Sequence, residues 1–188
     1  MLLNEKEAIE KVLNGDNEAF SIIVDLHQKI VFNITLKMTG EKEAAMDISQ
    51  ETFLQAFSRL SSFDKTKKFG PWLYRIAHNK CLNYLKRKKH PSAPTPCSEK
   101  LDLINSNKKE AELTAQKLDQ KELLKELNRE IAQLPQKEQS AFLLKYTNNL
   151  PLKDISTILS IPVSAIKTHL FRARNKLRTK LKWWFNDE

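Results

Sequence analysis

The sequence predicts an all-α protein made of two small helical domains that a flexible linker joins. Apolar residues recur at helical spacing along most of the 188 residues, and no stretch alternates as a half-buried strand would. Three glycines and an aromatic fraction of 8% argue against an all-β or glycine-loop architecture. Three prolines stand within six residues of HPSAPTPCSEK, which is the composition of a linker.

The first domain is expected to span residues 1–90. Gly15, Gly40 and the segment SSFDKTKKFGP separate its periodic stretches, and Asp16 or Asn17 and Thr39 are suitable boundary residues. The expected helices cover residues 4–14, 17–38, 41–60 and 71–89.

The linker is expected to cover residues 91–118, with order returning near residue 115, and the second domain to cover 119–188. Two helices, DQKELLKELNREIAQL and QKEQSAFLLKYTNN, meet at Pro135. The segments PLKDISTILS and PVSAIKTHLFRARNKLRTKLKWWF then have the layout of a helix-turn-helix. Small Ser156 suits a close helix crossing, and Ser160 occupies a turn position where such motifs usually have glycine.

Charge and composition indicate a cytoplasmic protein with a polyanionic partner. The net charge is +9, divided as +4 before the linker and +5 after it, which favours nucleic acid or an anionic membrane surface. We expect no signal peptide and no membrane-spanning run of about 18 apolar residues. Cys81 and Cys97 form no zinc spacing, so we expect reduced thiols, no metal and no cofactor.

The last predicted helix combines a narrow core stripe with a cationic outer face. Seven basic residues and no acid lie between positions 162 and 182. In a helix-turn-helix the second helix enters the major groove, where its first residues read base edges and further cations hold phosphates. The alternative is a solvated helix whose Phe171 another helix covers. The expected core stripe is Ile166, Leu170, Ala173 and Leu177. The expected DNA-reading residues are Ser164, Lys167, Thr168, Phe171 and Arg172, with Arg174 among the phosphate-binding cations.

The helix WLYRIAHNKCLNYLKRKK mixes aromatic, amide and cationic groups on one side, which is what unstacked bases and their phosphates need. The preceding loop adds Phe63, Lys67, Lys68 and Phe69. The alternative is that Trp72 simply packs under this loop. The buried side should hold Leu73, Ala77, Cys81 and Tyr84. The side for nucleic acid should hold Trp72, Arg75, Asn79, Asn83 and Lys86.

The helix AAMDISQETFLQAFSRL should bury Met46, Phe53, Ala56, Phe57 and Leu60. Its opposite side is an acidic patch with one leucine, which is a candidate protein-docking face or an ordinary solvated helix side. That patch consists of Asp47, Gln50, Glu51 and Leu54.

Together these segments resemble a known family. DISQETFLQAFSRLSSFDKTKKFGPWLYRIAHNKCLNYLKRKK resembles region 2 of an extracytoplasmic-function sigma factor of the sigma-70 family. LPQKEQSAFLLKYTNNLPLKDISTILSIPVSAIKTHLFRARNKLRTKL resembles region 4. The resemblance covers nearly the whole chain except the linker.

The resemblance implies a bacterial alternative sigma factor that binds core RNA polymerase and promoter DNA and that an anti-sigma factor controls. It implies that Asp47, Gln50 and Glu51 dock on the polymerase clamp helices. The 63–70 loop and Asn79 would capture a flipped minus-10 base, and Lys167, Thr168, Phe171 and Arg172 would read the minus-35 element. Met46 and His169 depart from the usual family residues.

Two other functions compete with this interpretation. An enzyme needs converging catalytic groups, and the sequence shows no phosphate-binding loop, no catalytic triad and no two-metal carboxylate set, so we expect no catalytic residue. A stand-alone helix-turn-helix regulator would need a phosphoacceptor or ligand pocket before residue 90, and neither is evident. Binding to core polymerase would separate a regulator from a sigma factor.

Overall fold

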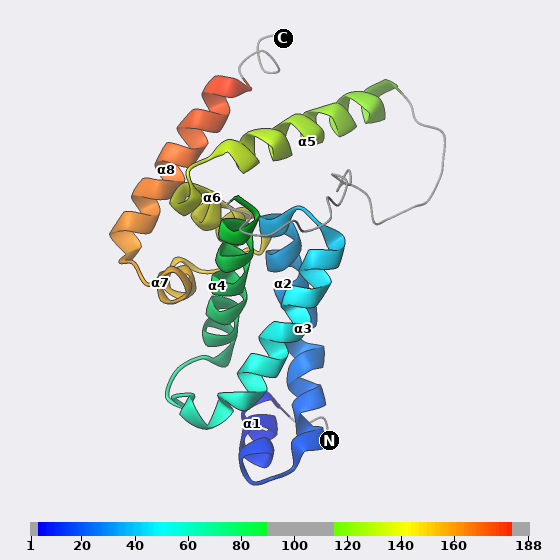
Figure 1. Ribbon diagram of the computed structural model, residues 1–188. Coiled ribbons are helices and arrows are strands. Elements are labelled where there is room, and N and C mark those ends of the chain that lie inside the picture. The colour runs from blue at the N-terminus through cyan, green and yellow to red at the C-terminus, as the bar shows by residue number, and fades with distance from the viewer. Residues whose placement is uncertain (1–3, 90–114, 182–188) are drawn as a thin grey trace.

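The computed structural model describes residues 4–89 and 115–181, and every regular element within these ranges is helical (Figure 1). The expected linker therefore lies almost wholly outside the described residues. The N-terminal domain consists of α1 (Glu5–Leu13), η1 (Asn17–Ala19), α2 (Phe20–Thr39), α3 (Lys42–Ser58), η2 (Leu60–Ser62) and α4 (Phe69–Lys89). The C-terminal domain consists of α5 (Ala115–Gln133), α6 (Gln136–Phe142), the π-helical turn η3 (Leu143–Thr147), α7 (Leu152–Leu159) and α8 (Val163–Lys180).

Local chemistry sets the ends of the first helices close to the expected positions. Asn4 caps α1 through a reciprocal pair of hydrogen bonds with Glu7, and the Asp16 side chain accepts from the Ala19 amide at the start of η1. Gly40 ends α2 in the left-handed conformation with φ of 74°, where a glycine has no steric penalty.

The core of the N-terminal domain lies where α2, α3 and α4 pack on one another. Helix α3 turns a stripe of mostly small residues inward: Ala45, Ile48, Thr52 and Ala56. Small side chains allow neighbouring helix axes to approach closely, and the larger side chains then lie at the flanks. The prediction that Met46 and Phe57 are buried is therefore wrong, because they are 47% and 39% exposed.

Helix α2 is strongly apolar. With η1 it forms a helical stretch, Asn17–Thr39, whose length and mean hydropathy of 1.2 would also fit a membrane span. In the structure α1, α3 and α4 all pack against α2, and Ile23, Val31 and Ile34 are buried among them. The apolar composition is thus explained by its central place in a helical core.

Helix α4 buries more than one side. Leu73, Ala77 and Cys81 are fully buried, as their spacing predicts, and burial raises the pKa of the Cys81 thiol to about 12. Tyr84 is only partly buried, and its hydroxyl donates to Glu41. A second side carries His78, which is 5% exposed because it faces the C-terminal domain.

The C-terminal domain ends in the expected helix-turn-helix of α7 and α8. Ile166, Leu170, Ala173 and Leu177 are all buried, which confirms the predicted core stripe. Ser160 closes α7 with φ of 55°, a left-handed conformation that glycine adopts more readily. The Ser156 hydroxyl donates to the carbonyl of Ile161 at 2.6 Å and so ties the turn together.

The two domains pack against each other through α4 with α7 and through α2 with η3 (Figure 1). Among the described residues, three polar contacts cross this interface. The His78 ring and the Ser140 hydroxyl are 3.0 Å apart, the Asn33 amide donates to the Asn148 side chain at 3.1 Å, and Lys68 pairs with Asp154 at 3.3 Å. The spacing of apolar residues within each domain does not predict this contact.

Candidate nucleic-acid and polymerase interfaces

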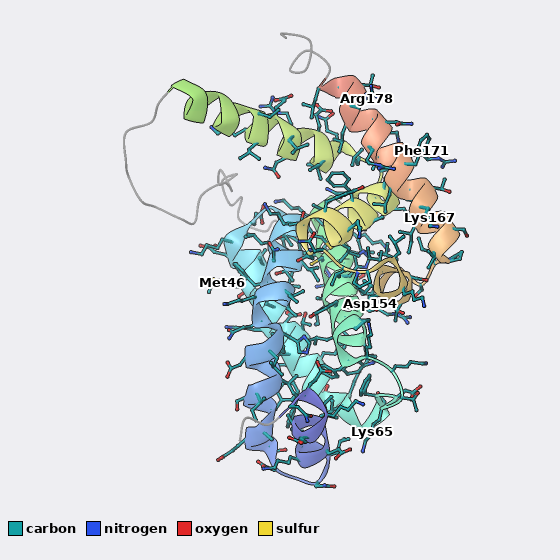
Figure 2. All side chains as sticks on the ribbon, turned by 180° about the vertical axis from the view of Figure 1, so that it is seen from behind. Met46, Lys65, Asp154, Lys167, Phe171 and Arg178 are labelled. Carbon is teal, nitrogen blue, oxygen red and sulfur yellow. The ribbon has the colours of Figure 1, made fainter. Side chains whose placement is uncertain are left out.

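The outer face of α8 is exposed and cationic. The predicted residues Ser164, Lys167, Thr168, Phe171, Arg172 and Arg174 are all exposed. Figure 2 shows Lys167, Phe171 and Arg178 projecting from the side of α8 that faces away from the rest of the molecule. The Phe171 side chain is 57% exposed, so no described helix covers it. Within the described residues the only ion pair of α8 joins Lys176 to Glu138, which leaves the other cations available to phosphates.

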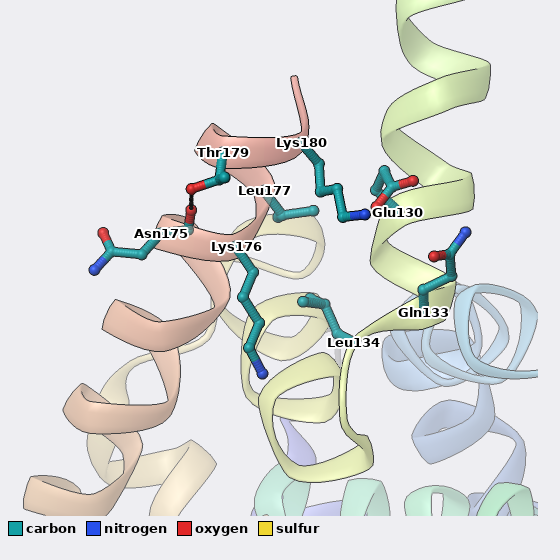
Figure 3. A pocket seen from close by; sticks show the side chains of 8 residues that line it. All are labelled: Glu130, Gln133, Leu134, Asn175, Lys176, Leu177, Thr179 and Lys180. Atoms are coloured by element: carbon teal, nitrogen blue, oxygen red, sulfur yellow. Dashed lines mark hydrogen bonds between the residues drawn. The ribbon is translucent and has the colours of Figure 1, made fainter. Parts of the chain in front are cut away.

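A groove of about 460 Å³ lies between α5 and the last turns of α8, on the C-terminal side of the predicted DNA-reading residues (Figure 3). Leu134 and Leu177 give it an apolar floor, while Lys176 and Lys180 stand at its rim. The Thr179 hydroxyl donates to the Asn175 carbonyl at 2.9 Å within its wall. The predicted DNA-reading residues and the groove are therefore separate features of the same helix.

The predicted nucleic-acid residues of α4 come together in a polar pocket of about 320 Å³. Four of them line it at helical spacing: Trp72, Arg75, Asn79 and Asn83. An unstacked base needs a π-face, hydrogen-bonding amides and nearby cations, and this wall supplies all three. Lys86, which is also predicted to contact nucleic acid, is exposed on the same helix but does not line the pocket.

Five of the nine residues that line the pocket are not predicted from the sequence. The additional lining residues are Gln55, Arg59, Ser62, Ile76 and Lys80. Lys80 is four residues after Ile76 and three before Asn83, so helical spacing alone was enough to find it. Gln55, Arg59 and Ser62 come from α3 and η2, and only tertiary packing brings them to α4.

The two loop phenylalanines are buried beneath the loop. Phe63 is 8% and Phe69 1% exposed, and their rings lie 5.2 and 5.3 Å from the Trp72 ring. Neither ring is accessible to a base in this conformation, because both belong to the core. Trp72 is half-buried, so it both packs under the loop and faces the pocket.

The loop between η2 and α4 is held by local hydrogen bonds and ion pairs. The hydroxyl and backbone amide of Thr66 donate to Asp64, and with Lys67 they hold the pKa of Asp64 below its usual range. Lys67 pairs with Asp64 at 3.3 Å, and Lys68 pairs with Asp154 of α7. Both lysines remain exposed, so their predicted DNA contacts would replace or share these partners.

A buried polar chain fixes the start of α4 under this loop. The Glu5 carboxylate is 2.7 Å from one nitrogen of His27, and the other nitrogen is 2.8 Å from the Tyr74 hydroxyl. Burial raises the pKa of Tyr74 to about 12, with further contributions from Glu5 and Asp154. Gly70 lies against this chain, since a Cβ there would be 3.3 Å from the Tyr74 ring.

The outer side of α3 carries an exposed acidic and apolar surface. Asp47, Gln50, Glu51 and Leu54 are all exposed, with Leu54 at 70%. Next to them a groove of about 380 Å³ lies between α2 and α3. Its walls include Met46, Gln50 and Phe53, so the unexpectedly exposed Met46 extends this surface. Acidic groups around an apolar groove suit a partner helix with basic and apolar side chains.

Comparison with known proteins assigns the two domains to one family. The family model described as "Sigma-70 region 2" matches residues 23–90, and "Sigma-70, region 4" matches residues 124–177. The sequence is 34% identical over 180 residues to the ECF RNA polymerase sigma factor SigW of Bacillus subtilis, covering 94% of this chain and 96% of that one. This chain belongs to the extracytoplasmic-function group of the sigma-70 family.

A further relative supports the assignment, and two solved structures share the fold. The RNA polymerase sigma-H factor of Pseudomonas aeruginosa is 27% identical, with 95% of this chain and 94% of that one covered. The fold is similar to that of CnrH in complex with the cytosolic domain of CnrY, with a TM-score of 0.70 at 20% identity over 95% and 97% of the chains. It is also similar to the sigma factor RpoE in complex with the anti-sigma factor NepR from Bartonella quintana, with a TM-score of 0.68 at 18% identity over 90% and 98%.

Proposed function

We propose that this sigma factor binds core RNA polymerase through α3 and reads promoter DNA through two further surfaces, the pocket on α4 and the outer face of α8. The observation that carries the proposal is the α4 pocket, where stacking, amide and cationic groups from three elements meet in a space large enough for an unstacked base.

The two DNA surfaces suit different states of the promoter. A helix with a cationic outer face enters the major groove of duplex DNA, so α8 would read the minus-35 element before strand separation. The α4 pocket would receive a base that has left the stack, with Asn79 and Asn83 offering hydrogen bonds to its edge. Lys67, Lys68 and Lys86 would hold the phosphates of the same strand, while Phe63 and Phe69 support the loop from within the core.

Polymerase docking would use the exposed surface of α3. Asp47 and Glu51 offer carboxylates, Leu54 an apolar contact, and Gln50 lies at the edge of the adjacent groove. Carboxylates at the rim of an interface set orientation and association rate, whereas the apolar centre gives most of the affinity.

We further propose control by an anti-sigma factor in the cytoplasm. The neighbouring folds include a sigma factor in complex with its anti-sigma factor, and the exposed α2–α3 groove offers a site for such a partner. An anti-sigma factor bound there would compete with polymerase, because Met46 and Gln50 belong to both the groove and the docking surface.

The test is runoff transcription with purified core polymerase on genomic fragments, together with a core-binding measurement. Asp47→Lys combined with Glu51→Lys should abolish or strongly weaken core binding and transcription while leaving the fold intact, because both side chains are exposed. Glu43→Lys, a charge reversal at another exposed position of α3, is the matched control.

A folded double variant that competes fully for core would overturn the docking assignment. A wild-type protein that binds operator DNA but never core polymerase would instead support the stand-alone helix-turn-helix regulator.

A further inference from the structure

An ion pair joins the polymerase-docking surface to the DNA pocket. The Lys80 ammonium of α4 lies 2.8 Å from a carboxylate oxygen of Glu51 on α3. The two side chains belong to different predicted surfaces, since Glu51 lies on the docking surface and Lys80 lines the pocket with Asn79 and Asn83. Their exposures differ as well, at 22% for Lys80 and 63% for Glu51.

This pairing reduces what each group can offer to an external partner. A lysine that holds a carboxylate in a short contact carries less attraction for a phosphate than an unpaired one. Glu51 is likewise partly neutralised toward a basic group of the polymerase. Both groups stay within reach of outside partners, because most of the Glu51 side chain is exposed and Lys80 stands at the pocket wall.

We infer that Glu51 and Lys80 form a switch that couples polymerase docking to capture of the minus-10 strand, an inference that rests on the proposed function. When a basic side chain of the polymerase takes Glu51, Lys80 is released into the pocket and binds a phosphate of the unpaired strand. Because coupling between two binding events is reciprocal, a strand bound by Lys80 also frees Glu51 for the polymerase. Lys80 is thereby a further DNA-binding residue, and Glu51 acts through it as a positioning residue.

The expected size of the coupling follows from the exposure of the pair. Ion pairs at protein surfaces change an equilibrium by about two- to fivefold, and the limited exposure of Lys80 argues for the upper part of that range. A coupling of this size favours DNA capture by the assembled holoenzyme over DNA capture by the free sigma factor, and it prevents neither.

The first experiment uses the free full-length protein. Its probe is a fluorescein-labelled single-stranded oligonucleotide with the non-template minus-10 sequence of a promoter that runoff transcription identifies. Glu51→Gln should raise the affinity about two- to fivefold, because it releases Lys80. Glu43→Gln removes the same charge from the same helix but does not release Lys80. It should change the affinity only by the salt-dependent amount that the loss of one negative charge produces.

A double-mutant cycle isolates the pair. Lys80→Gln should weaken binding of the oligonucleotide, and Glu51→Gln should give no gain in the Lys80→Gln background. A gain that persists there, or a Glu51→Gln gain no larger than that of Glu43→Gln, would overturn the switch.

The second experiment repeats the measurement with saturating core polymerase. The advantage of Glu51→Gln should disappear, since docking already occupies Glu51 in the wild type. An advantage that persists in the holoenzyme would contradict the inference. These results are distinct from a failure of the proposed function, which would show as absent runoff transcripts and absent core binding by the wild-type protein.

Discussion

The two surfaces of this sigma factor that we propose to read DNA are built in opposite ways. The outer face of α8 is a property of one helix, whose buried stripe and exposed face alternate along a single continuous segment. The α4 pocket is a property of three elements, because α3, η2 and α4 each contribute part of its wall. Single substitutions on the α8 face can therefore leave the fold intact, whereas the α4 pocket depends on how the N-terminal domain packs.

The aromatic residues make the difference concrete. Phe171 is 57% exposed on α8, while Phe69 is 1% exposed and contacts Phe63, His27 and Trp72. A residue proposed to read DNA on α8 is thus separable from the core. In the N-terminal domain the pocket wall rests directly on core side chains.

The largest effect should come from truncating these two phenylalanines in turn. Phe69→Ala should lower the free energy of unfolding by about 3–5 kcal/mol, because it empties a fully packed site under the loop. Phe171→Ala should change stability by less than about 0.5 kcal/mol and instead weaken binding to the minus-35 duplex. Chemical denaturation and duplex binding measured on both variants test the contrast.

Phe69→Leu serves as the control, since it keeps much of the apolar volume and should recover part of the stability. If Phe171→Ala destabilised the protein as much as Phe69→Ala, the α8 face would be part of the core and the comparison would fail.

The next effect separates the two surfaces by the state of the promoter. Arg172→Ala should cost about 1–3 kcal/mol at a cognate promoter, roughly a 5- to 150-fold loss, and the loss should shrink when the minus-35 element is already mutated. Asn79→Ala should impair capture of a minus-10 strand that is already unpaired, because its partner is available only outside the duplex. Open-complex formation on duplex and pre-melted promoters measures both.

Lys145→Ala is a suitable control, because this lysine lies on η3, away from α8 and the pocket. The same loss profile for Arg172→Ala and Asn79→Ala on every template would contradict the division between duplex and single-strand reading.

The same contrast explains which features of the two surfaces can be predicted from the sequence. The α8 core stripe and its exposed face could be predicted because both follow from one periodicity, and Phe171 is exposed as that pattern requires. Arg59 and Ser62 could not be assigned to the pocket, since nothing local relates them to Asn79. Met46 was placed inside because it is apolar, but the small residues of α3 bring the helices close and leave it at the flank.

The contact between the domains was the least predictable part. His78 is polar and falls outside the apolar stripe of α4, yet it is buried because the C-terminal domain covers it with Ser140. A pattern within one helix cannot reveal which distant segment will cover its second side. The helical class and the two domains agree with the sequence prediction, while their boundaries at residues 90 and 119 stay a prediction.

His78 therefore gives a pH test of how far the domains depend on each other. Burial lowers the pKa of His78 below its ordinary value of 6.5, and its second ring nitrogen is buried without a hydrogen-bond partner. As the pH falls below about 6.5, the unfolded chain takes up a proton at this position that the folded chain resists. For each unit by which the pH falls, the free energy of unfolding should then drop by up to about 1.4 kcal/mol more in the wild type than in a variant without His78.

The measurement is chemical denaturation of the wild type and of His78→Gln between pH 7.5 and about 5. Glutamine retains a hydrogen-bonding group toward Ser140 but does not titrate, so its stability should depend less on pH. Equal pH dependence in both proteins would mean that the interface opens before His78 is protonated, and the domains would then behave as independent units.

The smallest effect concerns the turn between α7 and α8, where Ser160 has a left-handed backbone conformation. Ser160 has φ of 55°, and a left-handed conformation destabilises a residue with a Cβ by about 1–2 kcal/mol. Glycine avoids this steric cost, but it loses more conformational entropy on folding than serine does, which offsets part of the gain. Ser160→Gly should therefore raise the free energy of unfolding by about 0.5–1 kcal/mol without changing minus-35 binding, since Ser160 is not among the predicted reading residues. Asn149 has a similar φ of 52° and is the matched control, because asparagine tolerates this conformation better and Asn149→Gly should stabilise less. Thermal and chemical denaturation compare the two variants. If Ser160→Gly lowered the stability, its side chain would be holding the turn rather than straining it, and the α8 face would depend on its surroundings as the α4 pocket does.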